Sequence, residues 1–109
     1  MMLKVEKVMS VTHDKIGTGL EAGDEVTVIC RARAGTQPTF YVGVEYGNIG
    51  DSFTKTTTDV SDDSAGLFKS TDVGEDGDDT FSTSIILTAA VADKAHTETF
   101  ICKVRSIQN

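Results

Sequence analysis

The 109-residue chain has no apolar run approaching the roughly 18 to 20 residues that a membrane-spanning helix requires. Its first ten residues, MMLKVEKVMS, also lack the apolar core of a signal peptide. We therefore expect a soluble protein without a membrane span. It is either intracellular or the mature part of an exported protein, and these locations imply opposite redox environments for its two cysteines.

Clusters of lysine and arginine are also absent. Residues 59–79 hold eight acids and one base, which alone gives −7, whereas the remaining residues hold nine acids and nine bases. Nucleic-acid binding requires clustered bases that neutralise phosphates. The sequence therefore predicts no nucleic-acid partner, and a neutral body that carries one strongly acidic loop region.

Catalytic and metal-binding spacings are missing as well. His13 and His96 lie far apart in polar contexts, with no metal-ligand spacing and no neighbouring nucleophile, so both are predicted surface residues. The glycines of GTGLEAG precede a strand pattern and open no helix, so they form no phosphate-binding motif. We expect a protein that is not an enzyme and that needs no cofactor.

Apolar and polar residues alternate with the period of a β-strand, and no stretch shows a sustained helical stripe. The strongest alternation lies in residues 25–34, 39–47, 80–89 and 98–104, with weaker patterns in 3–11, 52–60 and 66–71. Turn-forming residues separate these segments. The pattern predicts one all-β domain over residues 1–109, an antiparallel β-sandwich of about seven strands.

The two cysteines, Cys30 and Cys102, fall on the apolar faces of two of these strands. They can meet across two packed sheets, where a bridge would contribute on the order of 4 kcal/mol because it closes a long loop. The alternative is two buried reduced thiols that pack as small apolar side chains.

The sequence around the cysteines resembles the immunoglobulin superfamily. GDEVTVICRARAG is similar to strand B of that family with its first cysteine, and TETFICKVRS is similar to strand F with the second. The resemblance implies an Ig-like sandwich with a Cys30–Cys102 disulfide. The sequence departs from the family pattern at three places. Val42 or Val44 stands where the family has its core tryptophan, and Phe100 replaces the tyrosine two residues before the second cysteine. No strand G is visible after Cys102.

Three interpretations account for the missing last strand. The sequence ends early and leaves an open edge, or a strand from another subunit fills the gap. In the third, which we favour, the strand of Cys102 is itself the last one and pairs with residues 80–89, which makes the bridge to residues 25–34 doubtful.

Two groups of residues are candidate sites. The acidic stretch supplies oxygen ligands of the kind that calcium prefers, and its acids are Asp72, Glu75, Asp76, Asp78 and Asp79. The alternative is a solvated loop that promotes solubility. An interaction face is predicted from outward-facing residues of types favoured at interfaces, namely Tyr41 and Glu45 on one strand and Arg31 and Arg33 on another.

The function implied by the resemblance is protein recognition or adhesion, with a protein partner or self-association, by a secreted or extracellular domain. The alternative is a structural subunit of an assembly, such as a virion, phage tail or filament. The absence of an Asn-x-Ser/Thr sequon slightly weakens the case for a glycosylated cell-surface domain.

Overall fold

Strand β3, Glu25–Arg33, lies at the centre of the structure, a computed structural model. The structure describes residues 2–3, 7–14, 20–45, 47–56, 60–62, 66–70, 72–77, 79–90, 100–105 and 107–108. Val26, Val28, Cys30 and Ala32 on one face of β3 are completely buried, because successive side chains of a strand point to opposite faces. The strand therefore separates the core from solvent.

Eleven strands are present in the described part of the chain. They are β1 (Met2–Leu3), β2 (Lys7–His13), β3 (Glu25–Arg33), β4 (Thr39–Val44), β5 (Phe53–Lys55), β6 (Val60–Asp62), β7 (Phe68–Ser70), β8 (Val73–Gly77), β9 (Thr80–Ala89), β10 (Phe100–Arg105) and β11 (Ile107–Gln108). A single 3-10 turn, Ile49–Asp51, follows β4. No helix in these residues is long and apolar enough to cross a membrane.

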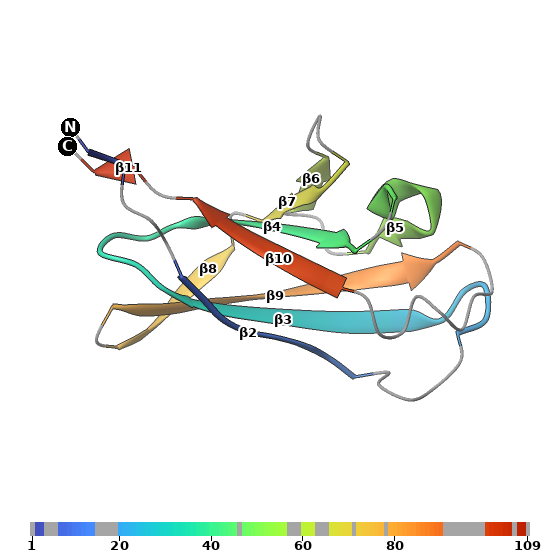
Figure 1. Ribbon diagram of the computed structural model, residues 1–109. Coiled ribbons are helices and arrows are strands. Elements are labelled where there is room, and N and C mark those ends of the chain that lie inside the picture. Colours follow the sequence, from blue (N-terminus) through green and yellow to red (C-terminus); the bar gives the residue numbers. More distant parts are fainter. Residues whose placement is uncertain are drawn as a thin grey trace.

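The strands form two main antiparallel sheets that face each other as layers (Figure 1). One has the order β2-β3-β9, with β5 and β8 both pairing with the far edge of β9. The other has the order β10-β4-β7-β6, and β1 pairs separately with β11. The predicted all-β antiparallel sandwich is confirmed.

The core fills the space between the two layers with the inward residues of both sheets. The inner face of β4 contributes Phe40 and Val42, both completely buried, against the inward residues of β3. At one end Phe100 of β10 packs on Phe53 of β5, with ring centroids 5.2 Å apart. His13, predicted as a surface residue, is half-buried and meets Phe100 edge-on, with ring centroids 5.1 Å apart.

The four strongest alternating segments all form strands, as predicted. There are eleven strands rather than about seven, because β1 is separate from β2, β8 and β11 were not expected, and residues 52–60 contribute to two strands rather than one. β5 joins the five-stranded sheet, whereas β6 begins at Val60 and joins the four-stranded sheet. The chain therefore crosses between layers within this segment.

The prediction of an acidic loop is wrong for residues 73–77, which form β8 and pair with the start of β9 as a hairpin. Backbone hydrogen bonds hold this pairing, so it does not depend on apolar side chains on both faces. Gly77 (φ 103°) and Asp79 (φ 65°) adopt the left-handed conformations that a tight hairpin turn requires.

The favoured interpretation of the last strand is also wrong. Cys102 lies on β10, which pairs with β4 in the register Cys102↔Val42 and not with β9. β9 and β10 belong to different sheets, because β9 already pairs with β3 on one edge and with β5 and β8 on the other. β10 is the edge strand of its sheet in the described part of the chain.

A buried chain of hydroxyl groups joins the two sheets where the chain passes from β7 to β8. The Thr83 hydroxyl donates its single proton to the Asp72 carbonyl at 2.8 Å, so the Ser70 hydroxyl donates to Thr83 Oγ1 at 2.6 Å. Ser70 and Thr83 are both buried. This network explains why a polar residue occupies the inward face of β9.

Replacement of Thr83 by valine, which has the same shape, should lower the free energy of unfolding by about 2 kcal/mol, because Ser70 and the Asp72 carbonyl lose their buried partner. Urea unfolding should show a lower midpoint with an unchanged slope. The control Ser84→Ala, at an exposed position of the same strand, should change stability by less than about 0.5 kcal/mol. Equal midpoints for both variants would contradict the role of the network.

Candidate interaction face

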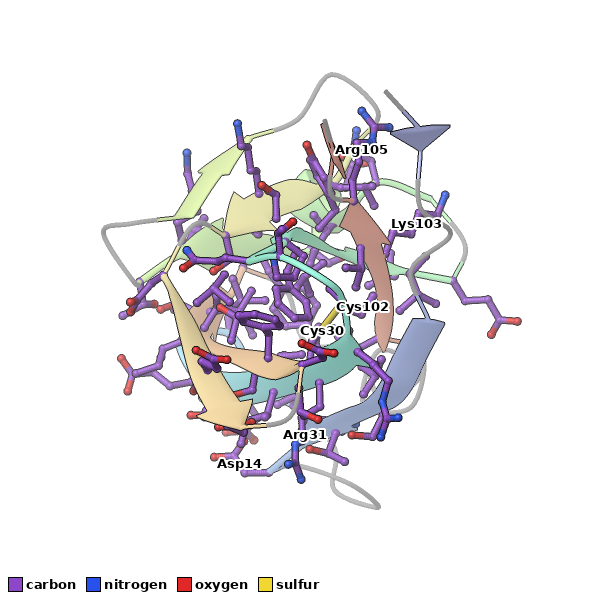
Figure 2. All side chains as sticks on the ribbon, turned by 90° about the vertical axis from the view of Figure 1, so that its left-hand side faces the viewer. Asp14, Cys30, Arg31, Cys102, Lys103 and Arg105 are labelled. Atoms are coloured by element: carbon purple, nitrogen blue, oxygen red, sulfur yellow. A yellow bond between two sulfur atoms is a disulfide. The ribbon has the colours of Figure 1, made fainter. Side chains whose placement is uncertain are left out.

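The structure brings Cys30 and Cys102 together at disulfide-bonding distance between the two sheets, with Cα atoms 6.4 Å apart (Figure 2). Cys30 lies at the middle of β3, flanked by Val11 of β2 and Thr83 of β9. Cys102 lies opposite Val42 of β4. The bridge therefore ties the edge strand β10 to the centre of the opposite sheet.

Reduction of the bridge, or the double substitution Cys30→Ala/Cys102→Ala, should lower the free energy of unfolding by about 4 kcal/mol, because the unfolded chain gains the freedom of a 72-residue loop. A thiol assay on the denatured, unreduced protein should detect no free thiol and, after reduction, two. Two reactive thiols before reduction would contradict the bridge.

The outer face of the four-stranded sheet centres on Tyr41, the half-buried outward residue in the middle of β4. Its direct neighbours across the sheet are Lys103 of β10 and Lys69 of β7. Side chains opposite each other on neighbouring strands lie within contact range. A row of lysine, tyrosine and lysine therefore crosses three strands.

Arg105 adds a third cation to this row. Its guanidinium lies over the Tyr41 ring, 5.5 Å from the ring centroid, in the geometry of a cation–π contact. Arg105 and Lys103 are both exposed and project from the same side of the molecule (Figure 2). The contact orients the arginine and keeps its hydrogen-bond donors accessible to a partner.

An apolar pair lies beside the basic row. Ile101 is opposite Gly43, and a Cβ atom built on Gly43 would lie 3.6 Å from Ile101 Cγ1 and would overlap Leu67 Cδ2. Glycine at position 43 thus lets Leu67 lie directly on the sheet next to Ile101. Both apolar side chains are half-buried.

We refer to these six residues as the Tyr41 face: Tyr41, Leu67, Lys69, Ile101, Lys103 and Arg105. Glu45, which we predicted to share an interaction face with Tyr41, is exposed just beyond the end of β4. It lies at the end of the face that carries Gly43 rather than Arg105. Tyrosine and arginine are enriched where interfaces are anchored. The face combines such anchors with apolar area and three positive charges.

Arg31 and Arg33, the other predicted interaction residues, are exposed on the outer face of the five-stranded sheet. The structure does not bring them to Tyr41 and Glu45, because the two pairs point away from opposite layers of the sandwich. Arg31 instead pairs with Asp76 of β8, with Nε and Oδ2 3.6 Å apart. Ile29 and Ile86 are exposed apolar residues on this same outer surface.

The acids proposed as calcium ligands lie along the β8–β9 hairpin. Asp72, Glu75, Asp76 and Asp79 are exposed, whereas Asp78 lies outside the described residues. Glu75 is opposite Phe81, which faces the core, whereas Asp76 lies at an irregularity of the pairing and reaches Arg31 on the outer face of the sheet. Among the described residues no three acids, histidines or cysteines gather in an arrangement that could hold a metal ion.

Sequence reasoning identified Tyr41 but missed the residues around it. Lys103 and Arg105 share the outward alternation of β10, which the sequence shows, but their position beside Tyr41 depends on the pairing of β10 with β4. Lys69 and Leu67 come from a weakly patterned segment whose partner strand the sequence does not identify.

Searches of protein-family models, curated proteins and solved structures with this chain return no match.

Proposed function

We propose that the protein is a recognition or adhesion module that binds a protein partner through the Tyr41 face. One observation carries the proposal: Tyr41 is held between two lysines and under an arginine, beside the apolar pair of Leu67 and Ile101. Interface centres combine anchoring aromatic and arginine side chains with apolar area in this way. The regular strands beneath hold these side chains in fixed relative positions.

The order of the strands supports the proposal that the sandwich is a member of the immunoglobulin superfamily. The order β2-β3-β9-β8 corresponds to strands A-B-E-D of that family, and the pair β4-β10 corresponds to C-F. The cysteines then lie on the equivalents of strands B and F. Val42, opposite Cys102, occupies the region where the family places its tryptophan against the disulfide.

The disulfide also supports a secreted or extracellular location for the domain, because such bonds persist in oxidising environments. Recognition modules of this architecture work by presenting a rigid sheet face or loops to a partner. The Tyr41 face is a sheet surface of this kind.

Site-specific photo-crosslinking tests the proposal directly. A photoreactive amino acid at position 69, beside Tyr41, should capture a protein partner from the native source, whereas the same group at position 84, on the outer surface of the other sheet, should not. Adding Tyr41→Ala should reduce capture at position 69 at least tenfold, since anchors of this type contribute about 2 kcal/mol or more. Capture from position 84 alone would contradict the proposal.

A second candidate function, a structural subunit of an assembly such as a virion or filament, is favoured by the edge of β10. In the described part of the chain β10 pairs with β4 alone, and β2, the edge strand of the other sheet, lies close to it. An unpaired strand edge presents backbone donors and acceptors that can accept a strand from another subunit.

Light scattering tests this second function. Assembly through β10 should raise the measured mass above 11.6 kDa and should persist in 1 M salt, because strand pairing relies on backbone hydrogen bonds rather than on exposed charges. A mass of 11.6 kDa throughout the concentration series would exclude assembly by this edge under those conditions.

A further inference from the structure

We propose that the Tyr41 face binds the acidic β8–β9 hairpin of a second copy of this chain. The inference rests on the proposed function, since it names the partner of the same face. It starts from the segregation of charge in a chain whose net charge is −7. A group of positive side chains around Tyr41 and a group of negative side chains on the hairpin occupy different surfaces of the molecule.

The Tyr41 face is locally basic although the chain is acidic. Six basic side chains are described in the structure, and three of them, Lys69, Lys103 and Arg105, surround Tyr41. The strands β4, β7 and β10 contain no acid, and Glu45 lies just beyond the end of β4 that is farther from Arg105. The face therefore offers donors that fit carboxylates, above all the arginine fork.

The hairpin has the complementary chemistry. Asp72, Glu75, Asp76 and Asp79 are exposed within eight residues, and the segment from Asp72 to Asp79 contains no base. Arg31 holds Asp76 from within the same copy, which leaves the other three acids without a salt-bridge partner among the described residues. β8 is an edge strand of the five-stranded sheet, because the β9 residues that pair with it also pair with β3, so the sheet holds these carboxylates at fixed spacing.

The two surfaces lie on different sheets of the sandwich. The Tyr41 face and the hairpin of one copy therefore cannot both contact the same surface of a second copy. The hairpin lies at the end of the sandwich where β3 leads into β4, whereas the Tyr41 face covers the outside of the β10-β4-β7 layer (Figure 1). A contact between unlike surfaces is head-to-tail. Each copy then retains one free face and one free hairpin, so the contact can repeat.

The dimensions of the two surfaces indicate a weak contact. β8 has five residues and is about 17 Å long, and the three strands of the face span about 10 Å across. An interface of this size belongs to the small, transient class. Its exposed ion pairs are individually weak and sensitive to salt.

Salt dependence provides a signature because two electrostatic effects oppose each other. At about 0.01 M salt the screening length is about 30 Å, so the net charge of −7 on each copy repels the other as a whole. At about 0.1 M it is about 10 Å, which screens this repulsion but leaves direct contacts. Association should therefore be strongest at intermediate salt and be lost at 1 M.

Sedimentation equilibrium of the oxidised full chain at up to about 1 mM, the range of weak contacts, measures the association. At about 0.1 M salt the weight-average mass should exceed 11.6 kDa and rise with concentration. A face variant, Lys69→Gln/Lys103→Gln/Arg105→Gln, and a hairpin variant, Asp72→Asn/Glu75→Gln/Asp79→Asn, should each associate at least tenfold more weakly.

Mixing the two variants is the decisive experiment. The face variant retains an intact hairpin and the hairpin variant retains an intact face, so an equimolar mixture should form a capped pair of twice 11.6 kDa and nothing larger. The matched control Glu21→Gln/Glu25→Gln/Asp51→Asn removes three exposed acids elsewhere and should associate at least as well as the wild type. Circular dichroism checks that every variant is folded.

A wild-type mass of 11.6 kDa at about 1 mM and 0.1 M salt would overturn the inference, as would a mixture that shows no pair. Association that persists unchanged in both variants and at 1 M salt would also overturn it and would point to the β10 edge. If the wild type does not associate but position 69 captures a different protein, the proposed function stands and only this choice of partner is wrong.

Discussion

The position of β10 is the constraint on which the rest of the structure depends. β10 lies at the edge of its sheet, so backbone hydrogen bonds hold it on one side only in the described part of the chain. Two further contacts hold it from below: the bond from Cys102 to Cys30 and the packing of Phe100 on Phe53. An edge strand fixed at both points cannot slip in register without breaking the core.

The two faces of β10 have different roles because side chains alternate along a strand. Phe100, Cys102 and Val104 face inward and close the core. Ile101, Lys103 and Arg105 face outward and form half of the Tyr41 face. Since one register places both sets, the disulfide that stabilises the core also positions the basic side chains beside Tyr41.

Alternation in the sequence identifies the inward and outward residues of the main strands correctly, because burial and strand period are coupled in a two-layer structure. The buried residues of β3 and β9 follow the predicted faces, with Thr80 at the start of β9 as the exception. Alternation does not, however, determine which strands pair with each other. Nothing in the residues 98–104 distinguishes β4 from β9 as a neighbour, since either would bury the same face, so the favoured interpretation of the last strand was wrong.

The acidic strand β8 escaped prediction for a related reason. An edge strand that the opposite sheet does not cover buries few side chains, so its sequence needs no apolar alternation. Val73 is the apolar side chain of β8 that packs against the core. The features that do indicate a hairpin are the glycine at position 77 and the aspartate at position 79, both with positive φ. Because these turn residues stand within a run of acids, the high local charge suggested a loop or an ion site rather than a hairpin.

Charge on the edge strands β8 and β10 also bears on how copies of the chain meet. Charged side chains on an edge strand prevent pairing with identical edges. β8 carries Glu75 and Asp76, whereas β10 carries Lys103 and Arg105, so each edge repels its own counterpart on a second copy. The same charges attract β8 to β10. Like-to-like strand addition is therefore disfavoured at β8 and at β10, whereas the contact that we propose pairs unlike charges by joining the acidic hairpin of one copy to the basic face of the next.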